Sequence, residues 1–225
     1  MQTFREYADF DFHMHSSFSF DSLQTPKNII KRSLKCGLSG IAVTDHNTIN
    51  GALATRKSIN DMKCNLQVII GEEVRTDIGD VIGLFLDKEI ESRHFYDMVE
   101  EVKGQNGLVV LPHPYKSMDI IPTQVLEKID AIEVLNGRTP RDLNELAVLI
   151  SNDHNIPKIA GSDAHFSIEI GRSRTRIPVD IGDISEPEIF IKALRDKRCK
   201  LLGGESLGCL TYLGLIIKLW KNGHI

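Results

Sequence analysis

The chain has 225 residues, of which 41% are hydrophobic and 26% are charged, and its formal net charge is −4. This composition is typical of a globular protein and excludes long disordered stretches. An acidic chain also argues against bulk binding to duplex DNA, which requires a basic surface. Chains of this length commonly fold as one unit, so we expect a single domain over residues 1–225.

Cysteine usage and hydropathy indicate the compartment. The four cysteines lie far apart and form no C-x-x-C pair, which excludes a zinc ribbon. No apolar leader is visible at the start, and the longest apolar stretch is shorter than the roughly 20 residues that a transmembrane helix needs. We therefore expect a cytoplasmic protein with free thiols and no membrane partner.

Short apolar runs rich in β-branched residues alternate with stretches of helical periodicity. Strands are predicted, in chain order, at residues 9–14, 40–44, 67–70, 81–86, 108–111, 131–135 and 158–161. Helices are predicted at residues 25–36, 47–60, 92–103, 123–128, 140–152 and 185–196. This alternation is typical of a mostly parallel sheet, either a barrel or an open doubly wound sheet.

Two predicted helices begin with capping residues. Thr25 precedes Pro26, a pair typical of an N-cap and the first helical position. Ser185 and Glu188 have the spacing of a capping box. The segment 205–225 that follows is apolar at close to helical spacing. We interpret it as core packing or a dimer contact, with a membrane-surface helix as the alternative.

Polar residues follow most of the predicted strands. Five of the eight histidines lie at these strand ends, namely His13, His15, His46, His113 and His165. In parallel α/β folds the carboxyl ends of the strands form the functional site. One such histidine would be explained as a hydrogen-bonded structural residue. Five of them, together with Glu73 and Asp163, are costly to bury without compensation, which indicates a site for several divalent metal ions.

The spacing of these residues adds a geometric expectation. Residues i and i+2 of a strand point to the same face, so His13 and His15 are predicted to bind one ion together. Asp163 and His165 share this spacing but follow their strand, so they can diverge to two ions.

These motifs resemble those of the PHP family, the polymerase and histidinol phosphatase domains. The segments that carry the resemblance are DFHMHSSFSFDS (11–22), GIAVTDHNTINGA (40–52), GEEVRT (71–76), LPHPY (111–115), IEVLN (132–136) and GSDAH (161–165). The resemblance implies an α/β fold, a distorted TIM-like (β/α)7 barrel over about residues 9–200, and two or three bound ions. Mixed nitrogen and oxygen ligands suit Zn²⁺, Mn²⁺ or Fe²⁺.

The same resemblance implies a ligand set. The first ion takes His13, His15, Glu73 and Asp163. The second takes Glu73 as a bridge together with His113, and the third takes Asp21, His46 and His165. Asp45 is expected to orient a ligand histidine. Many relatives place a further histidine where this chain has Asp80, which either binds the second ion or is a turn residue beside Gly79.

The expected reaction follows from the charge of such a site. Divalent ions outweigh the carboxylates Asp21, Glu73 and Asp163, so the site attracts phosphate, and a hydroxide shared by two ions is a nucleophile at neutral pH. We expect a metal-dependent phosphoesterase for a small phosphorylated metabolite or a nucleotide, with Glu73, His113, Asp163 and His165 as catalytic residues. The alternatives are a C–N hydrolase and a non-catalytic metal-binding module of a larger assembly.

Arginines supply a second indication of a phosphate substrate. Arg172, Arg174 and Arg176 alternate just after the GSDAH motif, and Arg138 follows Asn136. Arginine forms paired hydrogen bonds with phosphate, so Arg138 and Arg172 are the expected substrate-binding residues. The alternative is a solvated edge strand whose charges oppose aggregation.

Overall fold

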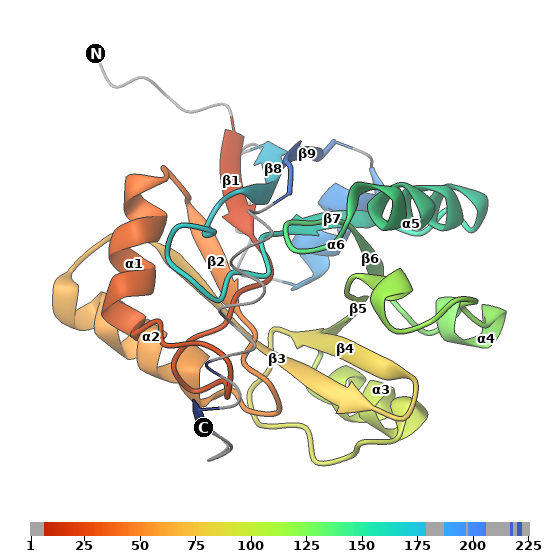
Figure 1. Ribbon diagram of the computed structural model, residues 1–225, viewed down its shortest axis with the longest axis horizontal. Coiled ribbons are helices and arrows are strands. Elements are labelled where there is room, and N and C mark those ends of the chain that lie inside the picture. Colours follow the sequence, from red (N-terminus) through yellow and green to blue (C-terminus); the bar gives the residue numbers. More distant parts are fainter. Residues whose placement is uncertain (1–6, 179–186, 197, 206–216, 218–219, 222–225) are drawn as a thin grey trace.

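The structure is a computed structural model that describes residues 7–178, 187–196, 198–205, 217 and 220–221 (Figure 1). Its strands are β1 (Tyr7–Asp11), β2 (Gly40–Val43), β3 (Gln67–Thr76), β4 (Gly79–Leu84), β5 (Leu108–Leu111), β6 (Ala131–Asn136), β7 (Lys158–Gly161), β8 (Ser173–Pro178) and β9 (Lys200–Gly203). Its helices are α1 (Pro26–Lys35), α2 (Asn50–Met62), α3 (Phe95–Lys103), the 3₁₀ turn η1 (Pro114–Lys116), α4 (Thr123–Leu126), α5 (Arg141–Asp153) and α6 (Pro187–Arg195).

The strands form one sheet in the order β7-β6-β5-β4-β3-β2-β1-β8-β9. Strands β1 and β7, the first and last of seven strands in this order, meet just beyond their carboxyl ends. There the amide of His15 donates to the carbonyl of Ala164 (2.9 Å), and the amide of Asp163 donates to the carbonyl of His13 (2.8 Å). Seven strands therefore curl into a nearly closed barrel, which confirms the predicted (β/α)7 fold. Helices α1 and α2 lie on one side of it and α4 and α5 on the other (Figure 1).

Strand β4 is the distorted part of the barrel. It runs antiparallel to both β3 and β5, whereas the neighbours β1, β2 and β3 are parallel to one another. A tight turn replaces the helix that would otherwise connect β3 to the next strand, and Gly79 takes a φ of 119° there, which favours glycine. Residues 71–76 of β3 pair with residues 84–79 of β4, from Gly71 opposite Leu84 to Thr76 opposite Gly79. This pairing extends β3 beyond its predicted end at residue 70.

Alternate side chains of the strands point into the barrel. The inner cluster contains Phe10, Phe12, Ala42, Ile69, Ile82, Val110, Ala131 and Ile159, one or two from each of the strands around it. Phe190 of α6 packs on Phe12 with ring centroids 4.6 Å apart, so α6 contributes to this cluster. The opposite faces of the strands carry a second cluster, which includes Ile41 and Val43 and packs against the surrounding helices.

The end of β1 differs from its predicted course. The strand ends at Asp11 rather than at residue 14. Beyond it, the alternation of inward-facing and outward-facing side chains shifts by one residue. Phe10 and Phe12 belong to the inner cluster and Met14 to the outer one. This shift turns His13 and His15, on either side of Met14, toward the interior above the apolar floor.

Two of the three alternating arginines, Arg174 and Arg176, lie in β8, and Arg172 directly precedes it. Ser173 and Thr175 are buried, while Arg174 and Arg176 are half-buried and both bind Asp9 of β1. The alternation is therefore as predicted. The edge-strand alternative is wrong, because β8 pairs with β1 on one side and with β9 on the other and is therefore not an edge strand.

The capping of α1 is confirmed: the Thr25 side chain accepts from the amide of Asn28, and Pro26 is the first helical residue. Ser185 and most of the segment 205–225 lie outside the described residues. Among the described residues, none of the helices is long and apolar enough to cross a membrane. Cys36, Cys64 and Cys199 are free thiols.

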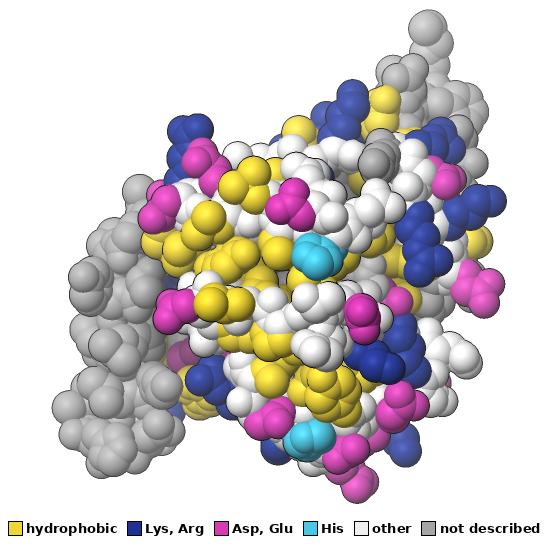
Figure 2. Space-filling view, turned by 90° about the vertical axis from the view of Figure 1, so that its right-hand side faces the viewer, with side chains coloured by type: hydrophobic (Ala, Val, Ile, Leu, Met, Phe, Trp, Pro, Cys, Tyr) yellow, Lys and Arg dark blue, Asp and Glu magenta, His cyan; other side chains and the backbone are white. Residues whose placement is uncertain are grey.

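Hydrophobic side chains gather on the face over α3, α4 and α5 (Figure 2). Exposed large hydrophobic residues of these helices are Tyr96, Leu146 and Leu149, and Ile120 precedes α4. The homodimer that the sequence suggested stays a prediction.

Candidate metal centre

The inner faces of the strands change from apolar to ionisable toward their carboxyl ends. Glu73 lies four residues beyond Ile69 on the same face of β3, and Glu133 lies two residues beyond Ala131 on β6. Both carboxylates are buried. A Cβ at Gly161 would approach Glu133 Oε1 and His13 Cβ to 2.5 Å, so glycine makes room for these groups at the end of β7.

His13 and His15 form the centre of the cluster. Their Nε2 atoms are 3.2 Å apart and both side chains are fully buried. The other nitrogen of each ring has a partner: His13 Nδ1 lies 3.2 Å from Glu133 Oε1, and His15 Nδ1 lies 3.1 Å from Ser19 Oγ. The lone pairs of the two Nε2 atoms repel one another at this distance unless a cation or a proton lies between them. The two rings lie together, as their i, i+2 spacing predicts, and their binding of one ion stays a prediction.

Asp45 acts on His15 through Ser19. The Ser19 hydroxyl donates to Asp45 Oδ1 at 2.7 Å and so offers its lone pair to the Nδ1–H of His15. Asp45 also accepts from the amide and hydroxyl of Ser16. A Cβ at Gly51 would lie 1.8 Å from Asp45 Oδ2, so the start of α2 must be glycine for this carboxylate to fit.

Glu73 lies between the other ionisable groups. Its Oε1 is 3.1 Å from His113 Nε2 and 3.5 Å from His13 Nε2. Its Oε2 is 3.0 Å from His46 Nδ1 and 3.4 Å from His15 Nε2. A carboxylate with both oxygens directed at different imidazoles is suited to bridge two ions, as the resemblance implies.

Asp21, His46 and His165 form a separate group at the side of the cluster. Asp21 Oδ2 lies 3.3 Å from His46 Nε2 and 3.0 Å from His165 Nε2, while His165 Nδ1 contacts the carbonyl of Asp163 at 2.9 Å. Asp21 Oδ1 is buried and has no hydrogen-bond partner among the described residues. His15 also lies within reach of this group.

Asp80 lies beside Glu73 and His113. One ligand atom from each of the three falls within 4.8 Å of the others. The Arg75 Nη1 atom donates to both carboxylate oxygens of Asp80, at 2.8 and 2.9 Å, so this arginine fixes the carboxylate in place. The structure thus brings Asp80 to the cluster, and its role as a ligand stays a prediction.

Backbone strain marks two of the residues at the centre. His113 has a φ of 26° and Asp163 a φ of 53°, which L-residues rarely adopt. Such strain persists only where surrounding structure holds it, and it is common at functional sites. Here the amide of His113 donates to Glu133 Oε2 at 3.1 Å.

The charges of the cluster depend on one another. Burial opposes ionisation of Glu73, but His13 and His46 outweigh it and hold the pKa of Glu73 well below its usual value. Burial opposes protonation of His13, yet Glu133, Asp163 and Glu73 raise its pKa well above the usual value. Burial together with His165 and His46 lowers the pKa of His15 to about 3. Without a cation among these groups, Glu73 is ionised, His13 holds a proton and His15 is neutral. A divalent ion bound there would displace the proton of His13, because a histidine ligand must be deprotonated.

The donor set fits several metal ions. Four groups have ligand atoms within 4.8 Å of one another: His15, Asp21, His46 and His165; His13, His113 and Glu133; His13, His15 and Asp163; and Glu73, Asp80 and His113. Every metal ligand predicted from the sequence belongs to one of them. The unpartnered Asp21 Oδ1 and the His113 Nδ1, which is also buried without a partner among the described residues, are consistent with such a role.

Three cationic side chains near the cluster differ in their surroundings. Lys116 Nζ lies 3.2 Å from Asp163 Oδ2 with a third of its side chain exposed, and the sequence reasoning missed it although it follows His113 by three residues. Arg138 is nearly buried and pairs with Glu169 at 3.1 Å, and Glu169 accepts from the amides of His165 and Phe166. Arg172 donates to the carbonyl of Ile168 at 3.4 Å.

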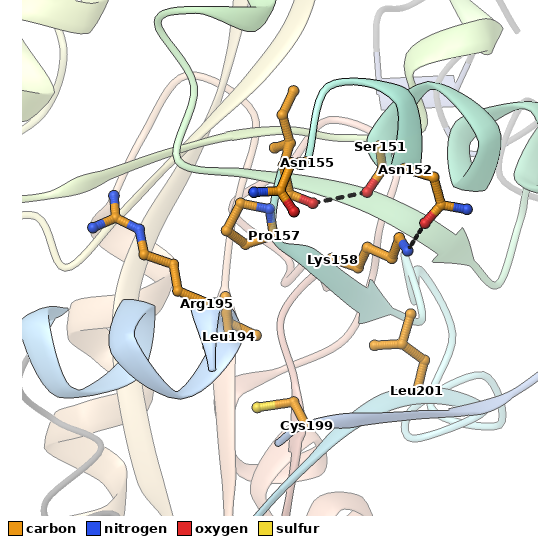
Figure 3. Close-up of a pocket in the computed structure, with 10 residues that line it drawn as sticks. Ser151, Asn152, Asn155, Pro157, Lys158, Leu194, Arg195, Cys199 and Leu201 are labelled. Carbon is orange, nitrogen blue, oxygen red and sulfur yellow. Dashed lines mark hydrogen bonds between the residues drawn. The ribbon is translucent and has the colours of Figure 1, made fainter. Parts of the chain in front are cut away.

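A cavity of about 530 Å³ borders the centre and is lined by Arg75, Asp80 and Lys116 among others. A second cavity, of about 600 Å³, lies at the start of β7 around Lys158, Arg195 and Cys199 (Figure 3). None of the predicted site residues lines the second cavity. The cavity that matters for the centre is therefore the one beside Asp80.

A nearly closed α/β barrel with this cluster of candidate metal ligands at the carboxyl ends of its strands defines a class of metal-dependent proteins. Within that class, this chain belongs to the PHP domain family, whose model matches residues 11–181. The match ends at residue 181, beyond β8 and before α6.

Relatives by sequence come from Methanocaldococcus jannaschii. The protein MJ1587 is 34% identical over 140 residues, which cover 56% of this chain and 81% of that protein. The protein MJ0417 is 30% identical over 212 residues, which cover 87% of this chain and 83% of that protein. Similarity therefore extends over most of this chain.

Known crystal structures share the fold, among them the two that follow. A two-domain protein from Bacteroides vulgatus containing a predicted PHP-like metal-dependent phosphoesterase superposes with a TM-score of 0.74 at 22% identity, covering 88% of this chain and 65% of that chain. Endonuclease Q in complex with a duplex substrate superposes with a TM-score of 0.60 at 17% identity, covering 84% of this chain and 57% of that chain. At these identities the likeness establishes the fold alone.

Proposed function

We propose that this chain is a metal-dependent phosphoesterase that binds two or three divalent ions. The observation that carries the proposal is the pair of buried imidazoles His13 and His15, whose Nε2 atoms converge at 3.2 Å while each Nδ1 has a partner. The proposed ligands are His13, His15, Asp21, His46, Glu73, Asp80, His113, Asp163 and His165.

The chain's own residues hold and orient the reacting groups. Glu133 and Ser19 hold the rings of His13 and His15. Glu73, His113, Asp163 and His165 surround the point where the substrate phosphate would react. Divalent ions, when bound, supply a nucleophilic hydroxide at neutral pH and neutralise the charge of a phosphate. Lys116, partly exposed beside Asp163, adds a positive charge for a phosphate oxygen.

The substrate class follows from the size and charge of the adjoining cavity. A volume of about 530 Å³ is that of a site for one small molecule. Arg75 and Lys116 are cations in its lining and suit a phosphorylated metabolite or a nucleotide. The net charge of −4 still argues against bulk binding to duplex DNA, and Arg172 remains a proposed contact to the substrate.

The proposal is tested with purified protein loaded with Mn²⁺, Zn²⁺ or Fe²⁺. Phosphomonoesters, phosphodiesters, nucleotides and a duplex with an abasic site are assayed for phosphate or strand products, and a parallel panel of amides is assayed for amine release. We expect turnover of a small phosphoester that His13→Ala abolishes and His154→Ala, an exposed histidine at the end of α5, leaves unchanged.

The other outcomes distinguish the alternatives. Amine release without phosphate release would replace the proposal with C–N hydrolysis. Cleavage of the duplex alone would identify DNA, rather than a small molecule, as the substrate. Verified metal content without turnover of any substrate would favour the non-catalytic module.

A further inference from the structure

Lys221 contacts the loop that carries Asp21, although it lies far beyond residue 181, where the family match ends. Its Nζ atom donates to three backbone carbonyls: those of Ser17 at 3.2 Å, Ser19 at 2.7 Å and Ser22 at 2.7 Å. An ammonium group has three donors and no acceptor, so these carbonyls satisfy it completely. A residue near the end of the chain thereby contacts the loop between β1 and α1.

The three carbonyls converge on one point. Their oxygens carry partial negative charge, so this arrangement is unfavourable unless a cation lies among them. Burial lowers the pKa of Lys221, and the negative charges of Asp21 and Asp45 oppose that change. The loop conformation therefore depends on a positive charge that the loop itself does not supply.

Other hydrogen bonds hold the two ends of this loop. The Ser22 hydroxyl donates to the carbonyls of His15 and His165, both at 3.0 Å. Gln24 Nε2 donates to the carbonyls of His15 and Ala164, both at 2.9 Å. These contacts join the ends of the loop to one another and to the carbonyls of residues 164 and 165, whereas Lys221 binds the carbonyls of Ser17, Ser19 and Ser22.

Asp21 depends on the course of the same loop. Its Oδ2 atom is placed between His46 Nε2 and His165 Nε2, at 3.3 and 3.0 Å. Phe20, the preceding residue, stacks on the His46 ring at a centroid distance of 4.6 Å. Carbonyls released from Lys221 would turn toward water, and Asp21 would move with them away from the two imidazoles.

We infer that Lys221 is a positioning residue for the ion site formed by Asp21, His46 and His165. The inference rests on the proposed function, because it takes these three side chains as metal ligands. It makes the occupancy of one ion depend on a residue outside the part of the chain that the family model matches.

The test compares Lys221→Met and Lys221→Ala with Asp21→Asn as the reference for loss of this site. Lys31→Met is the matched control, since it removes the same charge from an exposed position of α1. The readouts are the number of Mn²⁺ ions per chain by elemental analysis and the Mn²⁺ affinity by calorimetric titration. We expect both Lys221 variants to lose the one ion that Asp21→Asn loses, with at least tenfold weaker binding, and Lys31→Met to match wild type.

Chemical rescue separates a local effect from misfolding. Methylammonium added to Lys221→Ala restores a cation among the three carbonyls, so we expect it to restore the missing ion while the far-ultraviolet circular dichroism stays that of wild type. Wild-type metal content in Lys221→Met would overturn the inference, as would loss of all ions or failure of methylammonium to restore binding. A wild-type protein that binds its ions but hydrolyses no phosphoester would contradict the proposed function and leave this metal-binding result intact.

Discussion

The Oε1 atom of Glu133 lies 3.2 Å from Nδ1 of His13, and this contact directs Nε2 of His13 toward Nε2 of His15. Glu133 also accepts from the amide of His113 and from the side chain of Asn136. One buried carboxylate therefore sets the orientation of two of the proposed ligands, and it does so from β6, which pairs with β5 on one side and with β7 on the other.

Glu133→Gln should weaken metal binding without unfolding the protein. The amide of glutamine keeps the size of the side chain but lacks the charge that favours the Nδ1–H form of His13. Loss of such an orienting partner typically costs about 10–100-fold in metal affinity. Titration calorimetry with Mn²⁺ measures the change, and Glu127→Gln, exposed at the end of α4, is the control. Wild-type affinity in Glu133→Gln would mean that the contact is only structural.

Asp80 variants test the departure from the family pattern. If Asp80 binds the second ion, Asp80→Ala should lower the metal content by one site, Asp80→His should restore it, and wild type should prefer Mn²⁺ or Fe²⁺ over Zn²⁺ more than Asp80→His does. Arg75→Met should weaken the same site, because Arg75 holds both Asp80 oxygens. Equal metal stoichiometry in wild type and Asp80→Ala would make Asp80 a turn residue.

Lys116 and Arg172 should contribute differently to substrate binding. Lys116 Nζ lies 3.2 Å from Asp163 Oδ2, whereas the Arg172 side chain donates to the backbone carbonyl of Ile168. We expect Lys116→Met to lower kcat/KM by at least about tenfold, and Arg172→Ala to raise KM with kcat unchanged. Steady-state kinetics on the best phosphoester decides this. An unchanged KM in Arg172→Ala would remove Arg172 from the substrate site.

The contact between β1 and β8 predicts a pH-dependent stability. Burial raises the pKa of Asp9, but hydrogen bonds and charge from Arg176 and Arg174 outweigh it and lower the pKa below its usual value. A lowered carboxyl pKa stabilises the fold above the unfolded value of about 3.9, and this stabilisation is lost as the pH falls through the folded value.

Asp9→Asn should therefore destabilise the protein at pH 7 but not at low pH. We expect a loss of about 1 kcal/mol, or about 2–4 °C in Tm, at pH 7 that shrinks as the pH falls below the unfolded pKa of about 3.9. Urea unfolding between pH 3 and pH 7 measures it, with Asp61→Asn on the exposed side of α2 as the control. A difference that persists unchanged at pH 3 would contradict the charge-based explanation.

The amino-acid sequence alone was enough to predict the fold class and the family, and it also predicted where the candidate site lies. The order of the motifs and the histidines at the strand ends are local features, and each is visible without knowledge of neighbours. The N-cap at Thr25 was predictable for the same reason, because its partner is only three residues away. Period-two spacing was enough to pair His13 with His15.

The pairs of distant residues that meet were visible only in the folded chain. Glu133 and His13 are 120 residues apart, and Lys221 and Ser17 are 204 residues apart. The hairpin that makes β4 antiparallel depends on its pairing with both β3 and β5, and Arg174 and Arg176 bind Asp9 because β8 returns beside β1. Hydrophobic periodicity states which face of a strand is buried. It does not state which strands become neighbours, and the orientation of a buried imidazole depends on those neighbours.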